Sequence, residues 1–145
     1  MNEELVNSLK EVLADSYSLY FKAKGYHWNV EGIHFAQFHD MFESIASDAY
    51  GATDPLAEYI RSLQAYAPFK MSRFLEISSV KEAEVGADCH MMLADLLVAT
   101  EQILICVNRA FAIANSANQQ GIANFLAERD AEHKKWAWQL RASLA

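Results

Sequence analysis

The stretch HWNVEGIHFAQFHDMFESIASDAYGATDPLAE, residues 27–58, decides the fold. Five of its side chains are of types that transition metals accept as ligands: His27, His39, Glu43, Asp54 and Glu58. Two pairs within this set, His39 with Glu43 and Asp54 with Glu58, are spaced by four residues. Residues four apart share one helix face, so the stretch predicts a helix that carries two halves of a metal site. Imidazole with carboxylate suits iron, zinc or manganese, and an open site of this type is the usual setting for iron oxidation.

The two pairs cannot bind one metal ion within a single chain. Their midpoints, residues 41 and 56, are fifteen residues apart, which means roughly 22 Å along a straight helix and about 60° around it. A second copy of the helix, packed antiparallel about a two-fold axis near residues 48 and 49, would place position 41 opposite position 56. His27, at the end of the preceding helix, could complete each half-site beside His39. Small residues would permit the close approach: Ala46, Ser47, Ala49, Gly51 and Ala52.

Apolar side chains recur with a period near 3.6 in three further segments. Counted along the chain, the first helix is predicted to run from a cap at Asn2 to about Asn29. The helix of residues 27–58 is the second, and the third is predicted to start at a capping box formed by Ser79 and Glu82. The fourth follows the turn-prone stretch 115–121. Residues 65–78 lack such a period and are expected to form a crossover. An all-α, ferritin-like four-helix bundle with one long connection fits this order of elements.

Pro55 is the anomaly in the second predicted helix. A proline inside a helix removes one hydrogen bond and crowds the carbonyl four residues back, here that of Gly51, so a kink or break near 51–54 is expected. Thr53-Asp54-Pro55 also resembles a new helix start, with an N-cap followed by proline. Asp54 is therefore either a metal ligand or a cap.

Length, charge and cysteine content narrow the class of protein. A chain of 145 residues is expected to form one domain, residues 1–145. Its net charge of −7 means that it lacks the excess of basic residues that attracts proteins to nucleic acid or anionic membranes. Cys89 and Cys106 show no CxxC spacing and no signal peptide is expected, so we predict a cytoplasmic protein. The apolar region 96–114 is interrupted by polar residues, which argues against a membrane span.

The stretch resembles the signature of the Dps-like mini-ferritins. The matching residues are His27-Trp28-Asn29-Val30-Glu31-Gly32, then Phe35, Phe38-His39, and Asp54-x-x-Ala57-Glu58, and the similarity extends to Trp138-Gln139-Leu140-Arg141-Ala142. The resemblance implies a hollow dodecamer with an iron-oxidising centre at each two-fold interface. It assigns His27 of one chain, with Asp54 and Glu58 of its partner, to the first iron position. His39 and Glu43 would serve a second, weaker position.

The family activity implied by this resemblance is oxidation of Fe(II) with hydrogen peroxide or oxygen, followed by storage of the ferric product and protection against oxidative damage. The resemblance also implies electron transfer for Trp28, while an amphipathic interface aromatic is the alternative role. Three departures weaken the match. Position 43 is usually Asp in the family and is Glu here, and Pro55 lies between Asp54 and Glu58, where the family usually carries a residue compatible with an unbroken helix. The third departure is in the acidic pore residues, which appear here as Gln119 and Asn124, so iron entry would rely on other acids: Glu128, Asp130 or Glu132.

Two alternatives stay open at this stage, and a third, an intra-bundle di-iron site, is disfavoured. A Dps-like cage that has lost turnover would only sequester metal or serve a structural role, and a monomeric helical module would have no composite site. An intra-bundle di-iron site needs Glu-x-x-His motifs, and the single candidate, Glu31 with His34, lies in a turn.

His133 is expected on a solvated or pore-lining face. No lysine-rich tail is visible, so we predict no tight DNA binding, which a mobility shift at physiological salt would overturn.

Overall fold

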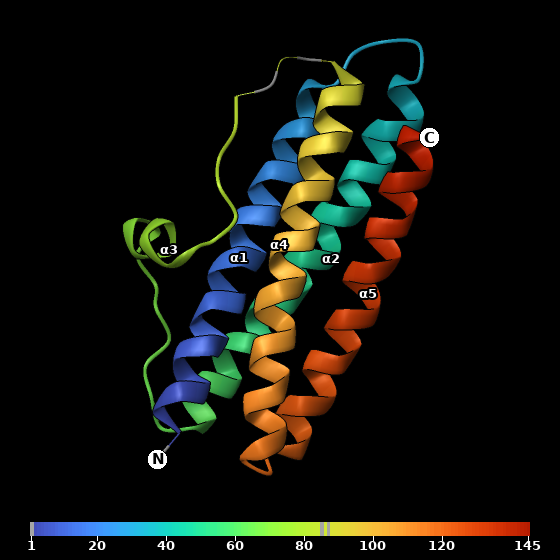
Figure 1. The fold of residues 1–145 in the computed structure, drawn as a ribbon. Helices are drawn as coiled ribbons and strands as arrows, with labels where there is room; N and C mark the ends of the chain where they lie inside the picture. Colours follow the sequence, from blue (N-terminus) through green and yellow to red (C-terminus); the bar gives the residue numbers. More distant parts are fainter. Residues whose placement is uncertain (1, 85, 87) are drawn as a thin grey trace.

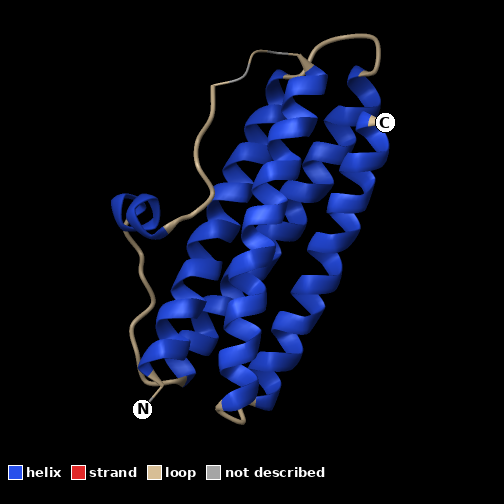
Figure 2. Cartoon of the chain, in the orientation of Figure 1, coloured by secondary structure: helices blue, strands red, loops and turns tan. Residues whose placement is uncertain are grey.

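The computed structural model describes residues 2–84, 86 and 88–145. The helices in these ranges are α1 (Glu3–Asn29), α2 (Phe35–Ser62), α3 (Met71–Ile77), α4 (Cys89–Ser116) and α5 (Gln120–Leu144). Apart from an isolated bridge between Glu31 and Asp88, these ranges contain no β-structure (Figure 2). The all-α prediction is confirmed.

The four long helices lie side by side, and the segment that carries α3 runs along the outside of the bundle (Figure 1). The pairs α1 with α2 and α4 with α5 are each joined by a short turn, whereas the chain between α2 and α4 travels from one end of the bundle to the other. The predicted bundle with one long crossover is therefore confirmed. Its core contains fully buried side chains from all four long helices, among them Leu9, Phe42, Ile45, Ile103 and Leu126.

Helix α4 begins later than the capping box at Ser79 predicted. Its N-cap is Asp88, whose carboxylate accepts from the backbone N–H of His90 at 2.9 Å. Ser79 is instead bound to Asp15, which accepts from the Ser79 backbone N–H at 2.7 Å and from its hydroxyl at 2.6 Å. Tertiary hydrogen bonds to this buried carboxylate outweigh the local capping signal. The short helix α3 was not predicted.

Helix α2 continues through Pro55 without interruption, so the alternative of a new helix start at Asp54 is wrong. Ala52 and Leu56, on either side of the proline, are both buried in the core and anchor the helix there. The carbonyl that Pro55 leaves without a helical partner belongs to Gly51, which is exposed and can therefore be hydrated. Packing thus offsets the lost hydrogen bond.

By length and composition, α4 is the one helix in the described part of the chain that could cross a membrane. The sequence argument from polar interruptions did not anticipate this. Leu96, Ile103 and Val107 of α4 are buried against the other helices of the bundle, and this explains its apolar composition without a membrane.

Candidate metal centre

The last turn of α1 and the first turns of α2 bring His27 and His39 together. Their rings stack with centroids 3.9 Å apart and planes inclined by 18°. The Nδ1 atom of each ring lies 2.7 Å from the backbone carbonyl oxygen of the other residue. A carbonyl oxygen only accepts, so both Nδ1 atoms must carry the proton. Each Nε2 atom then lies on the side of its ring away from the backbone partner, which is how metal-binding histidines present their ligand atom.

The carboxylate of Glu43 faces this histidine pair. Its Oε2 atom lies 3.1 Å from Nε2 of His27, and Nζ of Lys24 donates to both carboxylate oxygens at 2.8 and 2.6 Å. The hydrogen bond from Lys24 holds the pKa of Glu43 below its ordinary value. A carboxylate cannot donate, so the position between Nε2 and Glu43 requires a proton or a metal cation. His27, His39 and Glu43 therefore lie together as candidates for one half of a cation site.

Asp54 and Glu58 lie further along α2, and both are exposed. In the described part of a single chain, no group of three or more His, Cys, Asp or Glu residues is arranged to hold a metal ion. The structure thus brings together His27, His39 and Glu43 but keeps the second carboxylate pair apart from them. Trp28 adjoins the histidine pair in sequence and is 63% exposed, so its ring is free for contact with another molecule.

The surface between the two ligand pairs differs from the sequence prediction. Ala46, Ala49 and Ala52 are buried in the chain's own core, so these three cannot line an approach between two copies. Ser47 and Gly51 are exposed, and Tyr50 beside them is 54% exposed. The helix therefore presents a mixed surface with an aromatic side chain, because successive residues turn by about 100° and part of the small stripe faces inward.

Lys24 is the functional candidate that the sequence interpretation missed. It lies three residues before His27, and this spacing puts both side chains on one face of α1. Its ion pair with Glu43 places a fixed positive charge beside the second proposed metal position. The spacing itself was a usable signal, but only the fold shows that Glu43 lies opposite.

A second polar network lies between α2 and α5. Asp48 accepts from Arg129 Nη1 at 3.0 Å and Nη2 at 2.7 Å, and from the Trp136 indole N–H at 3.0 Å. His133 lies 3.3 Å from the same guanidinium and is 1% exposed. The prediction of a solvated or pore-lining His133 is therefore wrong. Burial, with Arg129 adding to it, lowers the pKa of His133 to about 3.

This buried histidine predicts a loss of stability in mild acid. The unfolded chain takes up a proton near the ordinary pKa of 6.5, whereas the folded chain does so near 3. Stability is therefore fully present above 6.5 and falls as pH falls from 6.5 toward 3, by about 2 kcal/mol between pH 7 and 5. Arg129 adds to this effect, while Asp48 and Asp130 oppose it.

His133→Gln should show a smaller loss of unfolding free energy between pH 7 and 5 than the unchanged chain, as measured by urea denaturation. His90→Gln, at an exposed position, is the matched control. Equal pH dependence in the His133 variant and the unchanged chain would contradict the assignment.

The residues considered for iron entry lie around the start of α5. Gln119 is the N-cap residue of α5, and Asn124 and Glu128 are exposed. Asp130 pairs with Lys134 at 2.9 Å and accepts from Asn108 at 3.0 Å, which makes it less available than Glu128.

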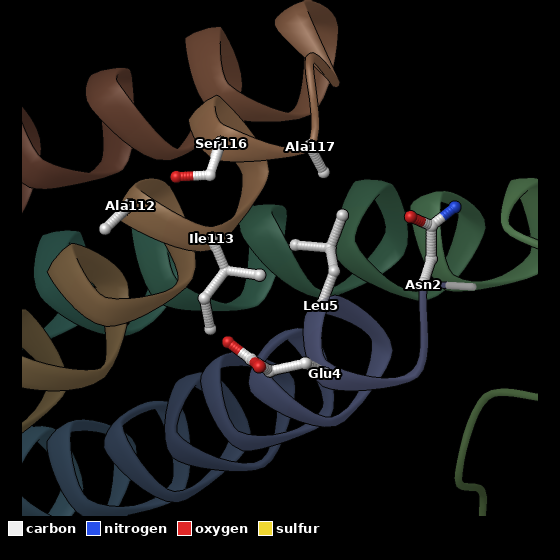
Figure 3. A pocket seen from close by; sticks show the side chains of 7 residues that line it. All are labelled: Asn2, Glu4, Leu5, Ala112, Ile113, Ser116 and Ala117. Atoms are coloured by element: carbon white, nitrogen blue, oxygen red, sulfur yellow. The ribbon is translucent and has the colours of Figure 1, made fainter.

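Two concave regions are lined by residues other than the histidine pair. One of about 380 Å³ lies between the start of α1 and the end of α4, with Glu4 at its edge (Figure 3). The other, of about 970 Å³, lies between α1 and the crossover and is lined by Phe21, Tyr26 and Phe74, among others. The residues that line these regions include no histidine, so neither matches the donor set described above.

Comparison with known proteins identifies the family of the chain. A model of the ferritin-like domain matches residues 6–145, and the chain therefore belongs to the ferritin-like family. An uncharacterised protein of Haemophilus influenzae is 32% identical over 141 residues, which cover 97% of this chain and 88% of that protein. DNA protection during starvation protein 2 of Bacillus anthracis is 29% identical over 144 residues, covering 99% of both.

Solved structures place the chain more narrowly. The Dps protein of Vibrio cholerae, described as a member of a broad superfamily of ferritin-like diiron-carboxylate proteins, superposes with a TM-score of 0.94. The two are 28% identical, and the match covers 99% of this chain and 91% of that one. Within the ferritin-like family, this chain is a Dps-like protein, as its sequence signature predicted.

Proposed function

We propose that this protein is an iron-oxidising and iron-storing mini-ferritin that protects against oxidative damage. The observation that carries the proposal is the half-site of His27, His39 and Glu43, in which both Nδ1 atoms are fixed as donors and both Nε2 atoms point away from their backbone partners. Iron is the substrate and the stored product, and hydrogen peroxide or oxygen is the oxidant. The family relationship supports this choice of metal.

Two chains would share each centre. His27 of one chain, with Asp54 and Glu58 of the partner subunit, would hold the first iron, because the two carboxylates are exposed and cannot reach His27 in their own chain. His39 and Glu43 would serve the second position. Carboxylate oxygens stabilise Fe(III), and imidazole leaves the Fe(II) shell open to oxidant. The working form is then a homo-oligomer built on two-fold dimers, and we propose the dodecamer of the family.

Lys24 should weaken the second metal position. A metal ion bound by Glu43 must displace the ammonium group, which already donates to both carboxylate oxygens. Lys24→Met removes this competitor, so anaerobic titration with Co(II) should change from one tightly bound ion per centre to two. Lys135→Met, at an exposed position on α5, should leave the count at one. Two tight ions in the unchanged protein would contradict this role.

The proposed function is tested by adding Fe(II) without oxygen and then supplying peroxide or oxygen. We expect Fe(III) to form faster than in protein-free buffer, in assemblies larger than a dimer. Oxidation no faster than in buffer, with the assembly intact, would favour the alternative of a silent metal-sequestering or structural cage. Elution at monomer size would remove the composite centre altogether.

A further inference from the structure

Helix α4 carries a line of apolar side chains on the side that faces away from the bundle core. Met91, Val98 and Ile105 are 48%, 65% and 53% exposed and follow one another at intervals of seven residues. Residues seven apart lie on nearly one face of a helix, and the exposed Ala112 continues the line by one more interval. We refer to Met91, Val98, Ile105 and Ala112 as the α4 stripe.

The α4 stripe is separate from the proposed metal centre. Helix α4 packs against α1 and α5, and α2 lies on the other side of the core (Figure 1). The stripe therefore faces away from α2, which carries most of the proposed metal ligands. A two-fold dimer formed through α2 leaves this surface uncovered, so its role does not depend on the iron chemistry.

Polar contacts border the α4 stripe on both sides. Toward α1, Arg109 donates to Glu11 at 2.7 Å, and toward α5, Asn108 donates to Asp130 at 3.0 Å. Single exposed apolar residues are ordinary on a protein surface. An apolar line inside a polar border has instead the composition of an interface, with an apolar centre and a polar rim.

The stripe leads into the concave region of about 380 Å³ between the start of α1 and the end of α4. Ala112 belongs to both, and Leu5 and Ile113 add apolar atoms to the lining of the region (Figure 3). Glu4, whose side chain is exposed, contributes a carboxylate. A line of side chains that ends in such a region fits an elongated ligand that inserts one end there.

An α-helix fits this surface better than an extended segment does. A seven-residue repeat is the interval at which a second helix packs its side chains along the first. Val98 and Ile105, in the middle of the stripe, are β-branched, as is common at the contact positions of paired helices. The small side chain of Ala112 allows the end of such a helix to approach closely.

The charge of the surface selects the kind of helix. Glu101 is exposed and lies beside the stripe between Val98 and Ile105, while Arg109 is already paired with Glu11. A second copy of α4 would bring its own Glu101 against this one, because residue 101 is at the middle of the stripe, and like charges placed opposite each other repel. The surface therefore complements a basic helix and disfavours a copy of itself.

We propose that the α4 stripe is the docking surface for a basic amphipathic helix of another protein. The partner helix places apolar residues seven apart against Met91, Val98 and Ile105, and a lysine or arginine beside Glu101. A second basic residue about eleven positions further on reaches Glu4, since residues 101 and 112 are roughly 16 Å apart along α4. The net charge of −7 attracts such a partner from a distance.

The test uses two labelled synthetic peptides, each about three heptads long, with leucine at the contact positions. One carries lysine at the flanking positions and the other carries glutamate. Fluorescence anisotropy at physiological salt measures their binding to the assembled protein. We expect the lysine peptide to bind at micromolar concentrations and the glutamate peptide at least about 10-fold more weakly. Ile105→Ser should weaken the lysine peptide about 10-fold, and Glu101→Lys should reverse the preference between the peptides.

Two matched variants control for binding elsewhere on the acidic surface. Ile33→Ser changes an isoleucine that is 95% exposed between α1 and α2, and Leu75→Ser changes a 59% exposed residue that lines the concave region beside α3. Both should leave binding of the lysine peptide unaltered. An equal loss in Ile105→Ser and Leu75→Ser would overturn the assignment to α4. Thermal melting checks that each variant folds, as expected for changes at exposed positions.

The remaining outcomes identify the other possible occupants. Failure of the lysine peptide to bind, or tighter binding of the glutamate peptide to the unchanged protein, would overturn the proposal. Light scattering that shows association between assemblies, reversed by Ile105→Ser, would overturn it in favour of a second copy of this chain. Flotation with vesicles of phosphatidylcholine and phosphatidylglycerol, reversed by the same variant, would overturn it in favour of lipid. None of these measurements involves iron, so they stand or fall apart from the proposed function.

Discussion

Glu58→Gln should lower the rate of Fe(II) oxidation at least about 100-fold, since even loss of a residue that supports a metal ligand typically costs 10–100-fold. The amide has nearly the shape of the carboxylate but lacks the charge that holds the metal and stabilises Fe(III). Glu58 is exposed in the single chain, so the unfolding free energy of the chain should change by no more than about 0.5 kcal/mol. Stopped-flow absorbance of Fe(III) measures the rate, and urea denaturation measures the stability.

Glu101→Gln is the matched control for this prediction. Glu101 is an exposed glutamate on α4, away from the proposed centre, so the same change should leave the oxidation rate unaltered. An unchanged rate in Glu58→Gln would show that this carboxylate is not a ligand. A comparable loss in both variants would point to general surface charge in place of a metal centre.

Asp15→Ala should lower the unfolding free energy by about 3–5 kcal/mol, equivalent to roughly 10 °C in melting temperature. Asp15 is completely buried in α1 and accepts four hydrogen bonds from the crossover. The donors are the Ser78 hydroxyl at 2.9 Å, the Ser79 N–H and hydroxyl at 2.7 and 2.6 Å, and the Val80 N–H at 3.2 Å. Alanine would leave the Ser79 backbone N–H without its partner, would leave the Val80 N–H only the Ser78 hydroxyl at 3.2 Å, and would release the crossover from α1.

Urea denaturation followed by circular dichroism measures this loss. Glu101→Ala removes an exposed carboxylate from a neighbouring helix and should change stability by no more than about 0.5 kcal/mol. Hydrogen exchange should show faster exchange at Ser79 and Val80 in the Asp15 variant. A loss below about 1 kcal/mol would mean that the crossover is held by its other contacts, since a typical single hydrogen bond contributes that much.

The spacing within residues 27–58 was sufficient to predict a helix there and the division of the candidate ligands into two groups. Four-residue spacing places His39 beside Glu43, and helix rise alone separates them from Asp54 and Glu58. The structure shows the first group clustered with His27 and the second pair exposed elsewhere. These features follow from local geometry, which is why sequence could anticipate them.

Features set by contacts between distant segments could not be anticipated. The capping signal at Ser79 fails because a carboxylate 64 residues earlier binds its backbone N–H. His133 was predicted to lie on a solvated or pore-lining face, yet it is buried in the core beside Arg129. Lys24 acquires its role only when α1 and α2 fold together and bring Glu43 within 2.6 Å. In each of these cases, contacts between helices or between a helix and the crossover decide where the side chain lies.

The central claim is that each centre takes His27 from one chain and Glu58 from another. The most direct measurement mixes two inactive chains, His27→Ala and Glu58→Gln, by co-expression, and compares iron oxidation with that of each parent. In a mixed dimer one of the two centres is intact, and half of randomly formed dimers are mixed, so the account predicts about a quarter of the unchanged activity. No recovery above the parents, in assemblies shown to contain both chains, would contradict it.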